Sequence, residues 1–407
     1  MTWLTRPSLI RQTLALSVAE LTAARDLDAA GRFMRELERK GALDRAVENL
    51  PSEEAMQALA RDGRGLTRPE LAVLLAYAKL DLNHAINESA LPGDPYFDSL
   101  LSGYFPPLAA ESFRNELKHH RLAREIVGTE LANRTVNLAG PLFAHRLREL
   151  SNAPLWGAAR AFALADGAFG LSDLKQRICA LDLKVPAQTQ NAAMGEIVDL
   201  LRRIGLWFIV QLPVADIGET VKMYSARFGA LRGRFSGLVS PLEAEAVEAR
   251  IAALKQAGMP FDVAEDIAIL PLLSAVPEIV LLAQNQGISA EDAARTYFAM
   301  GALVGLDRLR SLAGRIMASD HWDRLALRRI ADDLYSAQRR LACDALARAR
   351  SGPSGTGAVD RWAKLRRDDV ERTASFLSEL ERGGDATIAK LALANSQIQK
   401  LASAVSN

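Results

Sequence analysis

The side chains best suited to take part in a reaction stand close together in one apolar stretch. They are Lys79, Asp81 and His84. An amine, a carboxylate and an imidazole could hold a substrate and move a proton, which is general acid and base chemistry. The same groups could instead form a buried ion-pair network, because buried charges need partners. We favour the network, since no nucleophile with an adjacent base accompanies them. An independent helical enzyme or binding module that uses this cluster stays open as the alternative.

The other histidines and the glycines do not form a recognisable ligand site. His119 and His120 are adjacent, so a helix would direct them to different sides. No second ligand stands at the spacing of a metal site from the remaining histidines, which are His84, His145 and His321. Gly63 and Gly65 supply only the first half of a dinucleotide fingerprint, without a third glycine or a preceding strand. We therefore expect no catalytic, cofactor-binding or metal-binding residue in this chain.

The charged cluster belongs to the stretch 63–91, which has the best-marked helix start in the chain. Thr67 can cap this helix, and Glu70, three residues on, can return the hydrogen bond, which makes a capping box. Pro69 lies in the first turn, where its missing N–H removes no helical hydrogen bond. These residues predict a helix that begins within a residue or two of Thr67.

The same helix carries the densest apolar run of the chain. Its main face is formed by residues at three- and four-residue steps: Leu71, Leu74, Leu75, Ala78, Leu82, Ala85 and Ile86. Much of the opposite side is apolar as well, through Ala72, Val73, Ala76 and Leu80. A helix that is apolar on most sides must be covered on most sides, so we predict a buried central helix that the other helices wrap.

The rest of the chain shows apolar patterns of helical period and no sustained alternation of period two. A long helix is predicted over 111–139, with Phe113 and Leu122 among the residues on its buried side. Asn133 and Asn137 lie on or beside that face. We expect their amides to bind backbone or polar neighbours in the core, in preference to a ligand, because buried amides need partners.

These patterns predict an all-α chain, a large irregular multi-helix bundle around the central helix with a C-terminal helical hairpin. The main helical domain is expected over 12–350, with an irregular, glycine-rich connection at 225–241. A flexible linker follows at 351–359, and the hairpin occupies 360–407. Residues 1–11 form a separate N-terminal segment.

Composition excludes several classes of partner. Lys and Arg number 50 against 49 Asp and Glu, which leaves a formal charge of +1. Such a balance attracts neither nucleic acid nor an anionic membrane, and we expect neither as a partner. Cys179 and Cys343 stand far apart in helical patterns, which is typical of a reducing compartment. Without a signal-peptide pattern or an apolar run long enough for a membrane span, we expect a cytoplasmic protein.

The run GLTRPELAVLLAYAKLDL at 65–82 resembles, almost letter for letter, a signature of the large NAD-specific glutamate dehydrogenases of bacteria. The signature lies in the C-terminal part of those enzymes, after their catalytic domain. The resemblance extends over roughly residues 12–407, through runs that include LPGDPYFDSLLSGYFP, HRLAREIVGTELANRTVNLAGPLF and HWDRLALRRIADDL. Residues 1–11 do not match the segment that precedes this region in the family.

The resemblance implies a function that depends on residues outside this chain. In the family, an upstream domain oxidises L-glutamate to 2-oxoglutarate and ammonia with NAD as hydride acceptor. None of the motifs of that domain has a counterpart here, so no catalytic or NAD-binding residue is carried over. We therefore expect a structural, oligomerising or regulatory helical domain whose partner is the catalytic domain of the same enzyme, in a full enzyme that is a homo-oligomer.

Overall fold

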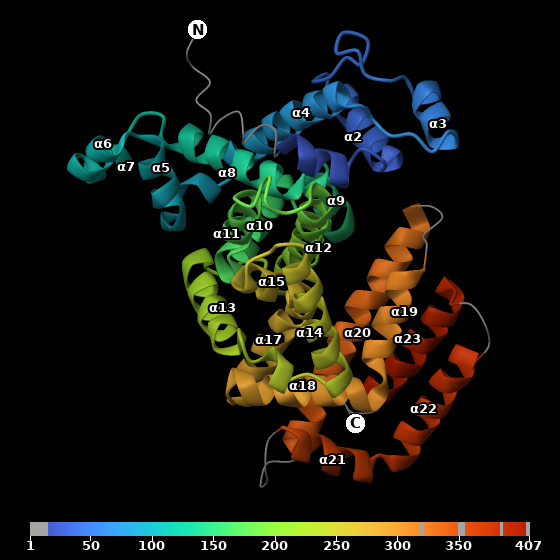
Figure 1. The fold of residues 1–407 in the computed structure, drawn as a ribbon. Helices are drawn as coiled ribbons and strands as arrows, with labels where there is room; N and C mark the ends of the chain where they lie inside the picture. The colour runs from blue at the N-terminus through green and yellow to red at the C-terminus, as the bar shows by residue number, and fades with distance from the viewer. Residues whose placement is uncertain (1–14, 317–320, 349–354, 383–385, 404–407) are drawn as a thin grey trace. The chain divides into compact units, whose positions relative to one another are not determined.

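The computed structural model describes residues 15–316, 321–348, 355–382 and 386–403, which are drawn in colour in Figure 1. Within these ranges the secondary structure consists of helices joined by turns and short connections, and no strand is present. The prediction of an all-α chain is confirmed. The chain divides into two compact units, one formed by residues up to 225 with 254–271 and the other by residues 226–253 with those from 272 onward.

The first unit contains most of the helices before residue 212. Its elements are a helix over 15–22, α2 (Leu27–Arg39), α3 (Glu53–Arg61), α4 (Arg68–Asn87), η1 (Leu91–Gly93), η2 (Pro95–Phe97), α5 (Asp98–Tyr104), α6 (Pro107–Ser112), α7 (Arg114–Lys118), α8 (Ala123–Ala139), α9 (Phe143–Ser151), α10 (Leu155–Phe169), α11 (Leu171–Cys179), α12 (Ala187–Gln211) and α15 (Phe261–Ala268). Three helices run across the division between the units, α13 (Ile217–Leu231), α14 (Pro241–Gln256) and α16 (Leu270–Leu273).

The helix covered on nearly all sides is α10 and not the predicted one. Its run LWGAARAFALADGAF is rich in alanine, and nearly all of these side chains are buried against α4, α8, α9 and α12. Small side chains let several neighbouring helices approach one axis closely, so an alanine-rich helix suits the centre of a bundle better than a leucine-rich one. The expectation of a central helix at 63–91 is therefore wrong in this respect.

The predicted central helix is α4, which begins as the sequence indicates. The capping box at Thr67 is present, and the Glu70 carboxylate accepts hydrogen bonds from the Thr67 N–H at 2.6 Å and from its hydroxyl at 2.7 Å. Leu71 and Leu74 are fully buried, as are the other leucines of the main face to within a few per cent. The opposite side is open to solvent, where Leu80 is 62% exposed. Hence α4 is amphipathic, with its apolar face against α8.

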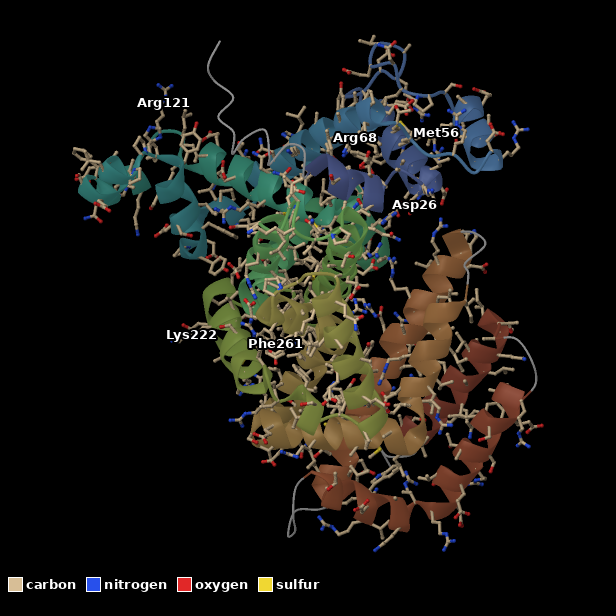
Figure 2. The ribbon with its side chains drawn as sticks, in the orientation of Figure 1. Asp26, Met56, Arg68, Arg121, Lys222 and Phe261 are labelled. Carbon is tan, nitrogen blue, oxygen red and sulfur yellow. The ribbon has the colours of Figure 1, made fainter. Side chains whose placement is uncertain are left out.

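The long helix predicted over 111–139 is divided into α6, α7 and α8, with a turn after Lys118. At this turn the Leu122 N–H donates to the His120 ring at 3.2 Å, and that ring packs on Phe105 with 5.3 Å between centroids. The interruption changes the direction of the apolar face, so Phe113 and Leu122 are 57% and 51% exposed instead of buried. The neighbouring Arg121 side chain points away from the ribbon (Figure 2).

The second unit is built around the 28-residue helix α20. Its elements are η3 (Phe235–Gly237), α17 (Val276–Gln286), α18 (Ala290–Val304), α19 (Leu306–Arg315), α20 (His321–Arg348), α21 (Thr356–Leu365), α22 (Arg367–Arg382) and α23 (Ile388–Ser403). As a predicted C-terminal hairpin requires, α22 and α23 pack side by side, and α23 also lies on α20 (Figure 1). The Trp362 indole is fully buried and donates to Asp344 at 2.6 Å.

Two boundaries differ from the sequence-based expectation. The stretch 225–241 was expected to be irregular, but α13 continues to Leu231 and η3 follows it. Residues 1–11 and 351–354 lie outside the described residues, and α21 begins at Thr356 inside the expected linker. The division into a main domain and a separately folding hairpin stays a prediction. Among the described residues no helix is long and apolar enough to span a membrane.

Substitutions on the two sides of α4 should differ in their effect on stability. Leu75→Ala removes a side chain that is 6% exposed and should lower the free energy of unfolding by about 2–5 kcal/mol, through lost burial and a cavity. Thr67→Ala should cost about 1 kcal/mol as a lost cap. Leu80→Ala, on the open side, should change it by less than about 0.5 kcal/mol. Urea unfolding of the three variants measures this order, and equal losses would contradict the assignment of the two faces.

Candidate functional site

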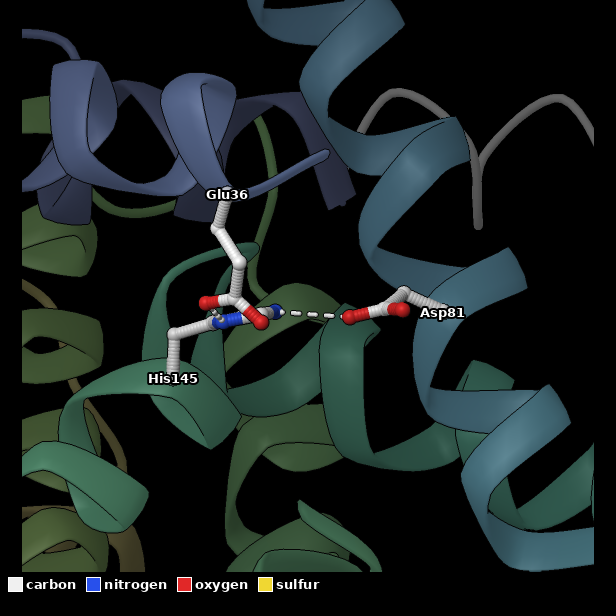
Figure 3. A group of neighbouring side chains, drawn as sticks. All are labelled: Glu36, Asp81 and His145. Atoms are coloured by element: carbon white, nitrogen blue, oxygen red, sulfur yellow. Dashed lines mark hydrogen bonds and ion pairs between the residues drawn. The ribbon is translucent and has the colours of Figure 1, made fainter. Parts of the chain in front are cut away.

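Three ionisable side chains from distant parts of the sequence meet in the first unit (Figure 3). They are Glu36 on α2, Asp81 on α4 and His145 on α9. The His145 Nδ1 lies 3.2 Å from a Glu36 carboxylate oxygen, and its Nε2 lies 3.2 Å from an Asp81 oxygen. The Nε2 contact is close, but its alignment falls outside hydrogen-bond geometry. The imidazole is thus held between two carboxylates.

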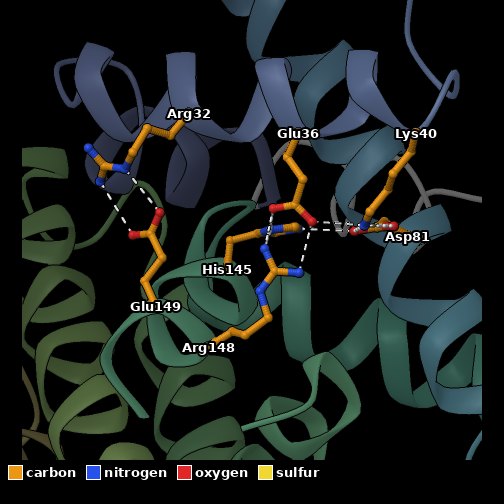
Figure 4. A network of polar contacts seen from close by, with 7 residues as sticks. All are labelled: Arg32, Glu36, Lys40, Asp81, His145, Arg148 and Glu149. Atoms are coloured by element: carbon orange, nitrogen blue, oxygen red, sulfur yellow. Dashed lines mark hydrogen bonds and ion pairs between the residues drawn. The ribbon is translucent and has the colours of Figure 1, made fainter. Parts of the chain in front are cut away.

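Two further cations complete this group, which we call the Glu36 cluster: Glu36, Lys40, Asp81, His145 and Arg148 (Figure 4). Lys40 caps the end of α2 and places its Nζ 2.9 Å from an oxygen of Glu36 and 2.9 Å from an oxygen of Asp81. Arg148, one turn after His145, binds both oxygens of Glu36, with a 2.8 Å contact from Nη1. Glu36 therefore faces two cations and the His145 ring, and Asp81 faces Lys40 and the same ring.

A second ion pair extends the contact between α2 and α9. The Arg32 guanidinium donates from Nε and Nη2 to the two oxygens of Glu149, at 3.0 Å and 3.4 Å (Figure 4). Arg32 also pairs with Asp28, one turn earlier on its own helix. Two parallel bonds from one guanidinium fix the orientation of both side chains as well as attracting them. The two helices are therefore joined at two places along their length.

The Glu36 cluster is shielded from water, which strengthens its electrostatic effects. The side chain of His145 is 7% exposed and that of Asp81 12%, and the Phe33 ring packs on the imidazole with 4.3 Å between centroids. The hydrogen bond with His145 contributes most to holding the pKa of Glu36 far below its usual range, and bonds from Arg148 and Lys40 add to it against the effect of burial. Burial acts to raise the pKa of Asp81, but His145 and Lys40 together lower it.

The same group has the spacing of a metal site. One ligand atom each from Glu36, Asp81 and His145 lie within 4.8 Å of one another. The carboxylate oxygens that a metal ion would need already accept from Lys40 and Arg148, which remain charged at neutral pH. A divalent ion would add positive charge beside these two cations and would have to displace them. The arrangement therefore fits an ion-pair clamp across three helices better than a metal centre.

Catalysis by this cluster also lacks its usual parts. A general base needs a free lone pair that faces a substrate, and here carboxylates face both ring nitrogens of His145. A nucleophile such as Ser or Cys is absent from the described contacts of the five residues. What the geometry supports is the mutual fixing of α2, α4 and α9.

The structure does not bring the three residues of the sequence-based cluster into one site. Asp81 belongs to the Glu36 cluster, whereas the His84 side chain is 74% exposed and pairs with Glu88 at 3.2 Å. Lys79 is half-buried, and burial lowers its pKa. Since α4 turns these side chains toward different surroundings, a shared catalytic role for Lys79, Asp81 and His84 has no geometric support.

The asparagines on α8, Asn133 and Asn137, differ from the sequence-based expectation in one atom. Both are half-buried, and the backbone carbonyl of Asn137 accepts a hydrogen bond from Lys175 at 2.6 Å. The Asn137 Oδ1 is buried, and within the described residues no group donates to it. The expectation that both amides find partners is therefore wrong for this atom. Burial lowers the pKa of Lys175 to about 8.

Sequence reasoning missed Glu36, His145 and Arg148 because their association is tertiary. His145 was set aside since no second ligand stands near it in the sequence, and its two carboxylate partners precede it by 109 and 64 residues. The one local signal was the spacing of His145 and Arg148, which places both on one face of a helix. That signal becomes informative only once the neighbouring helices are known.

Glu36→Gln keeps the shape of the side chain and removes the charge that Lys40, Arg148 and the His145 ring contact. We expect a loss of about 1–3 kcal/mol in the free energy of unfolding at pH 7. The pKa of Glu36 in the folded state lies below the unfolded value near 4.5. The stabilisation that the Glu36 carboxylate gives the folded state is therefore complete above about pH 5 and is lost as the pH falls further. Denaturant unfolding of the wild type and of Glu36→Gln should therefore show that their difference in free energy of unfolding becomes smaller between pH 7 and pH 4.

Glu88→Gln is the matched control, because Glu88 also pairs with a histidine but its side chain is 68% exposed. Its effect should stay below about 0.5 kcal/mol at every pH. A Glu36→Gln loss that is the same at pH 4 and pH 7 would contradict the electrostatic role of Glu36.

Comparison with known proteins places the helical scaffold in a family. The family model described as "Glutamate dehydrogenase, C-terminal" matches residues 63–400. NAD-specific glutamate dehydrogenases of Halomonas elongata and Pseudomonas aeruginosa are each 32% identical to the chain, over 392 and 394 residues. The enzyme of Mycobacterium tuberculosis is 31% identical over 360 residues.

The alignments with the Halomonas elongata and Pseudomonas aeruginosa enzymes each cover 96% of the chain, and the alignment with the Mycobacterium tuberculosis enzyme covers 88%. They cover only 24%, 24% and 22% of the relatives, so the chain spans about a quarter of their length. The family model and the relatives agree with the resemblance seen in the run at 65–82 and extend it over nearly all of the chain. The chain belongs to the family of the C-terminal region of glutamate dehydrogenases.

Proposed function

We propose that this chain acts as the helical C-terminal part of an NAD-specific glutamate dehydrogenase, with a structural and oligomerising role toward the catalytic part. The observation that carries the proposal is the alignment of 96% of the chain with 24% of two such enzymes. A region that occupies a quarter of an enzyme and contains no cofactor fingerprint contributes through packing and assembly. Because the chain matches the C-terminal region of these enzymes, it could also regulate the catalytic part through direct contact.

The chemistry of the described residues supports the same proposal. Hydride transfer requires a cradle for the cofactor pyrophosphate, cations for the substrate carboxylates and a base for the amine. In the Glu36 cluster the cations are already paired with carboxylates of the chain. Gly63 and Gly65, the residues of the partial fingerprint, lie before the start of α4 and follow no strand.

Within this proposal, the full enzyme oxidises L-glutamate with NAD to 2-oxoglutarate and ammonia, and the catalytic residues lie in the part that the chain does not cover. Its partner is that catalytic part, in a homo-oligomeric enzyme. We propose the cytoplasm as its location, where thiols stay reduced, because Cys179 and Cys343 are both free.

The purified chain should neither bind NAD nor reduce it in the presence of glutamate. The expected result is no rise in NADH absorbance and no heat of NAD binding in a calorimetric titration, because the described residues form no dinucleotide cradle. A variant with Lys79→Ala and Asp81→Asn serves as the control for trace activity from the host. Turnover that persists after removal of host enzyme and falls in this variant would overturn the proposal and make both residues candidate catalytic groups.

The positive test removes the matched C-terminal quarter from the Pseudomonas aeruginosa relative. If the region is structural, the truncated enzyme should lose its native oligomeric state in light scattering and most of its glutamate oxidation. Replacing the removed region by this chain should restore assembly, and the same replacement carrying Leu74→Asp, which puts a charge in a fully buried site, should not. A truncated enzyme with unchanged assembly and activity would refute the structural role.

A further inference from the structure

The chain turns between α18 and α19, at what we call the α18–α19 joint, residues 301–307 (Figure 1). Gly305 lies between the two helices with φ +76°, a backbone conformation that glycine adopts without strain. Gly301, one turn earlier, leaves room for polar side chains against the backbone of α18. A Cβ there would overlap the Gln338 Nε2 and would lie 3.0 Å from the Asp307 Oδ1. Polar groups of α19 and α20 therefore meet directly beside the joint.

Arg310 links the joint to α20. Its guanidinium pairs with the Asp307 carboxylate from Nη2 and donates from Nη1 to the Gln338 Oε1 at 2.6 Å. The central carbon of the same guanidinium lies 4.7 Å from the centroid of the Tyr335 ring. Gln338 is fully buried and donates to the Tyr297 carbonyl on α18 at 2.6 Å. One cation is thus shared among a carboxylate, an amide and an aromatic ring.

The pairing of Asp307 with Arg310 is incomplete. The Asp307 Oδ1 accepts from Arg310, whereas Oδ2 is buried and receives no hydrogen bond from the described residues. Because Oδ2 is buried, bulk water does not replace the missing donor. A buried charge with an unsatisfied oxygen costs free energy that a neutral carboxyl avoids. The geometry of the joint therefore favours the protonated form of Asp307.

Burial is the main reason why this carboxyl holds its proton. It raises the pKa of Asp307 to about 6 against the attraction of Arg310, and the like charge of Glu243 on α14 adds to the rise. Within the described residues, the other titratable groups that α18, α19, α20 and α23 bring to this place are Tyr297, Arg308, Tyr335 and Lys390. Asp307 therefore changes its charge in a pH range close to neutral.

We propose that Asp307 makes the α18–α19 joint pH-sensitive, so that proton uptake by its carboxyl tightens the joint and proton release loosens it. The proton binds at Oδ2, the oxygen that has no donor, and no other covalent bond changes. Protonation removes the incompletely paired charge, while Arg310 keeps its contacts with Gln338 and Tyr335. This regulatory role goes beyond the proposed structural one and does not depend on it.

The direction of the pH effect follows from the proton affinity of Asp307 in the closed and the open joint. The closed joint holds the proton more tightly than an unfolded chain, in which the pKa of an aspartate is 3.8. The stabilisation is therefore complete below about pH 4 and is lost as the pH rises through about 6. With these two pKa values, the ratio of closed to open joint is about tenfold higher at pH 5.0 than at pH 7.5.

Asp307→Asn imitates the protonated carboxyl at every pH. Hydrogen–deuterium exchange of the full chain, followed on peptides that span residues 298–312 and corrected for the intrinsic exchange rate, measures how often the joint opens. The protection of the wild type relative to Asp307→Asn should fall about tenfold between pH 5.0 and pH 7.5. The two proteins share every other titratable group, so the comparison isolates this carboxyl.

Asp369→Asn is the matched control. Asp369 also stands in the first turn of a helix and pairs with an arginine three residues away. Unlike Asp307, it has a donor on each oxygen, Arg366 on one and Arg372 on the other. Its replacement should change the protection of the joint by the same factor at pH 5.0 and at pH 7.5.

A direct titration keeps the inference testable even if Asp307→Asn does not fold. Carbon-13 NMR of the aspartate carboxyls in the wild-type chain should show one that titrates near pH 6. In Glu243→Gln this signal should titrate at lower pH, because a like charge is removed. The glutamine can still accept from the Ser240 hydroxyl at the start of α14, so that helix keeps its cap.

Two results would overturn the inference. In the first, no aspartate carboxyl that responds to Glu243→Gln titrates above about pH 5. In the second, the joint of Asp307→Asn shows the same pH dependence of protection as the wild type. Neither result would affect the truncation test of the structural role.

Discussion

The fixing of charge away from water is the constraint on which the packing of α2, α4 and α9 depends. Two carboxylates in a poorly solvated place would repel each other and would be costly to bury alone. His145 lies between them, and Lys40 and Arg148 supply positive charge beside them. Each of the three helices contributes at least one member, so none of them can shift without exposing an unpaired charge. This makes the cluster a determinant of specific helix positions more than a large source of net stability.

The apolar core imposes a different requirement, which is met on a different helix. Around α10, alanine and glycine let four neighbours approach, and large side chains such as Phe162 and Leu164 fill the remaining space. By contrast, α4 presents leucines on one face and leaves Leu80 in solvent. The position of α4 is therefore set on one side by packing against α8 and on another by the pairing of Asp81.

The sequence allowed the all-α class, the start of α4 and the C-terminal pair of helices to be predicted, because these depend on local patterns. Capping residues and apolar periodicity act over a few residues and can be read directly. The identity of the central helix could not be predicted in the same way. A high density of leucine predicts burial of α4, but alanine-rich α10 is covered on more sides, since burial depends on how closely neighbouring helices approach.

The candidate site was predictable only in part, for the same physical reason. Asp81 was recognised as a charge that needs a partner, but its partners Lys40 and His145 come from other helices. The end of α7 shows a second limit. The helical apolar period predicts one continuous helix here, but the chain turns, and the contact of His120 with Phe105 stabilises that turn. Local periodicity describes each helix well and says little about where the chain changes direction.

Some unusual residues of this chain are explained by the contacts they make in the fold, and others are not. His145 looks functional by composition, yet its two ring nitrogens face carboxylates of the chain, and these contacts join three helices of the fold. Leu183 has no reactive group, yet its backbone is strained and its side chain gains nothing from the folded chain. Under the proposed assembly role, contact surfaces are expected where an apolar residue is exposed in spite of its local cost. A search confined to ionisable side chains therefore selects residues that hold α2, α4 and α9 together, and it passes over a residue such as Leu183, whose exposure the fold does not explain.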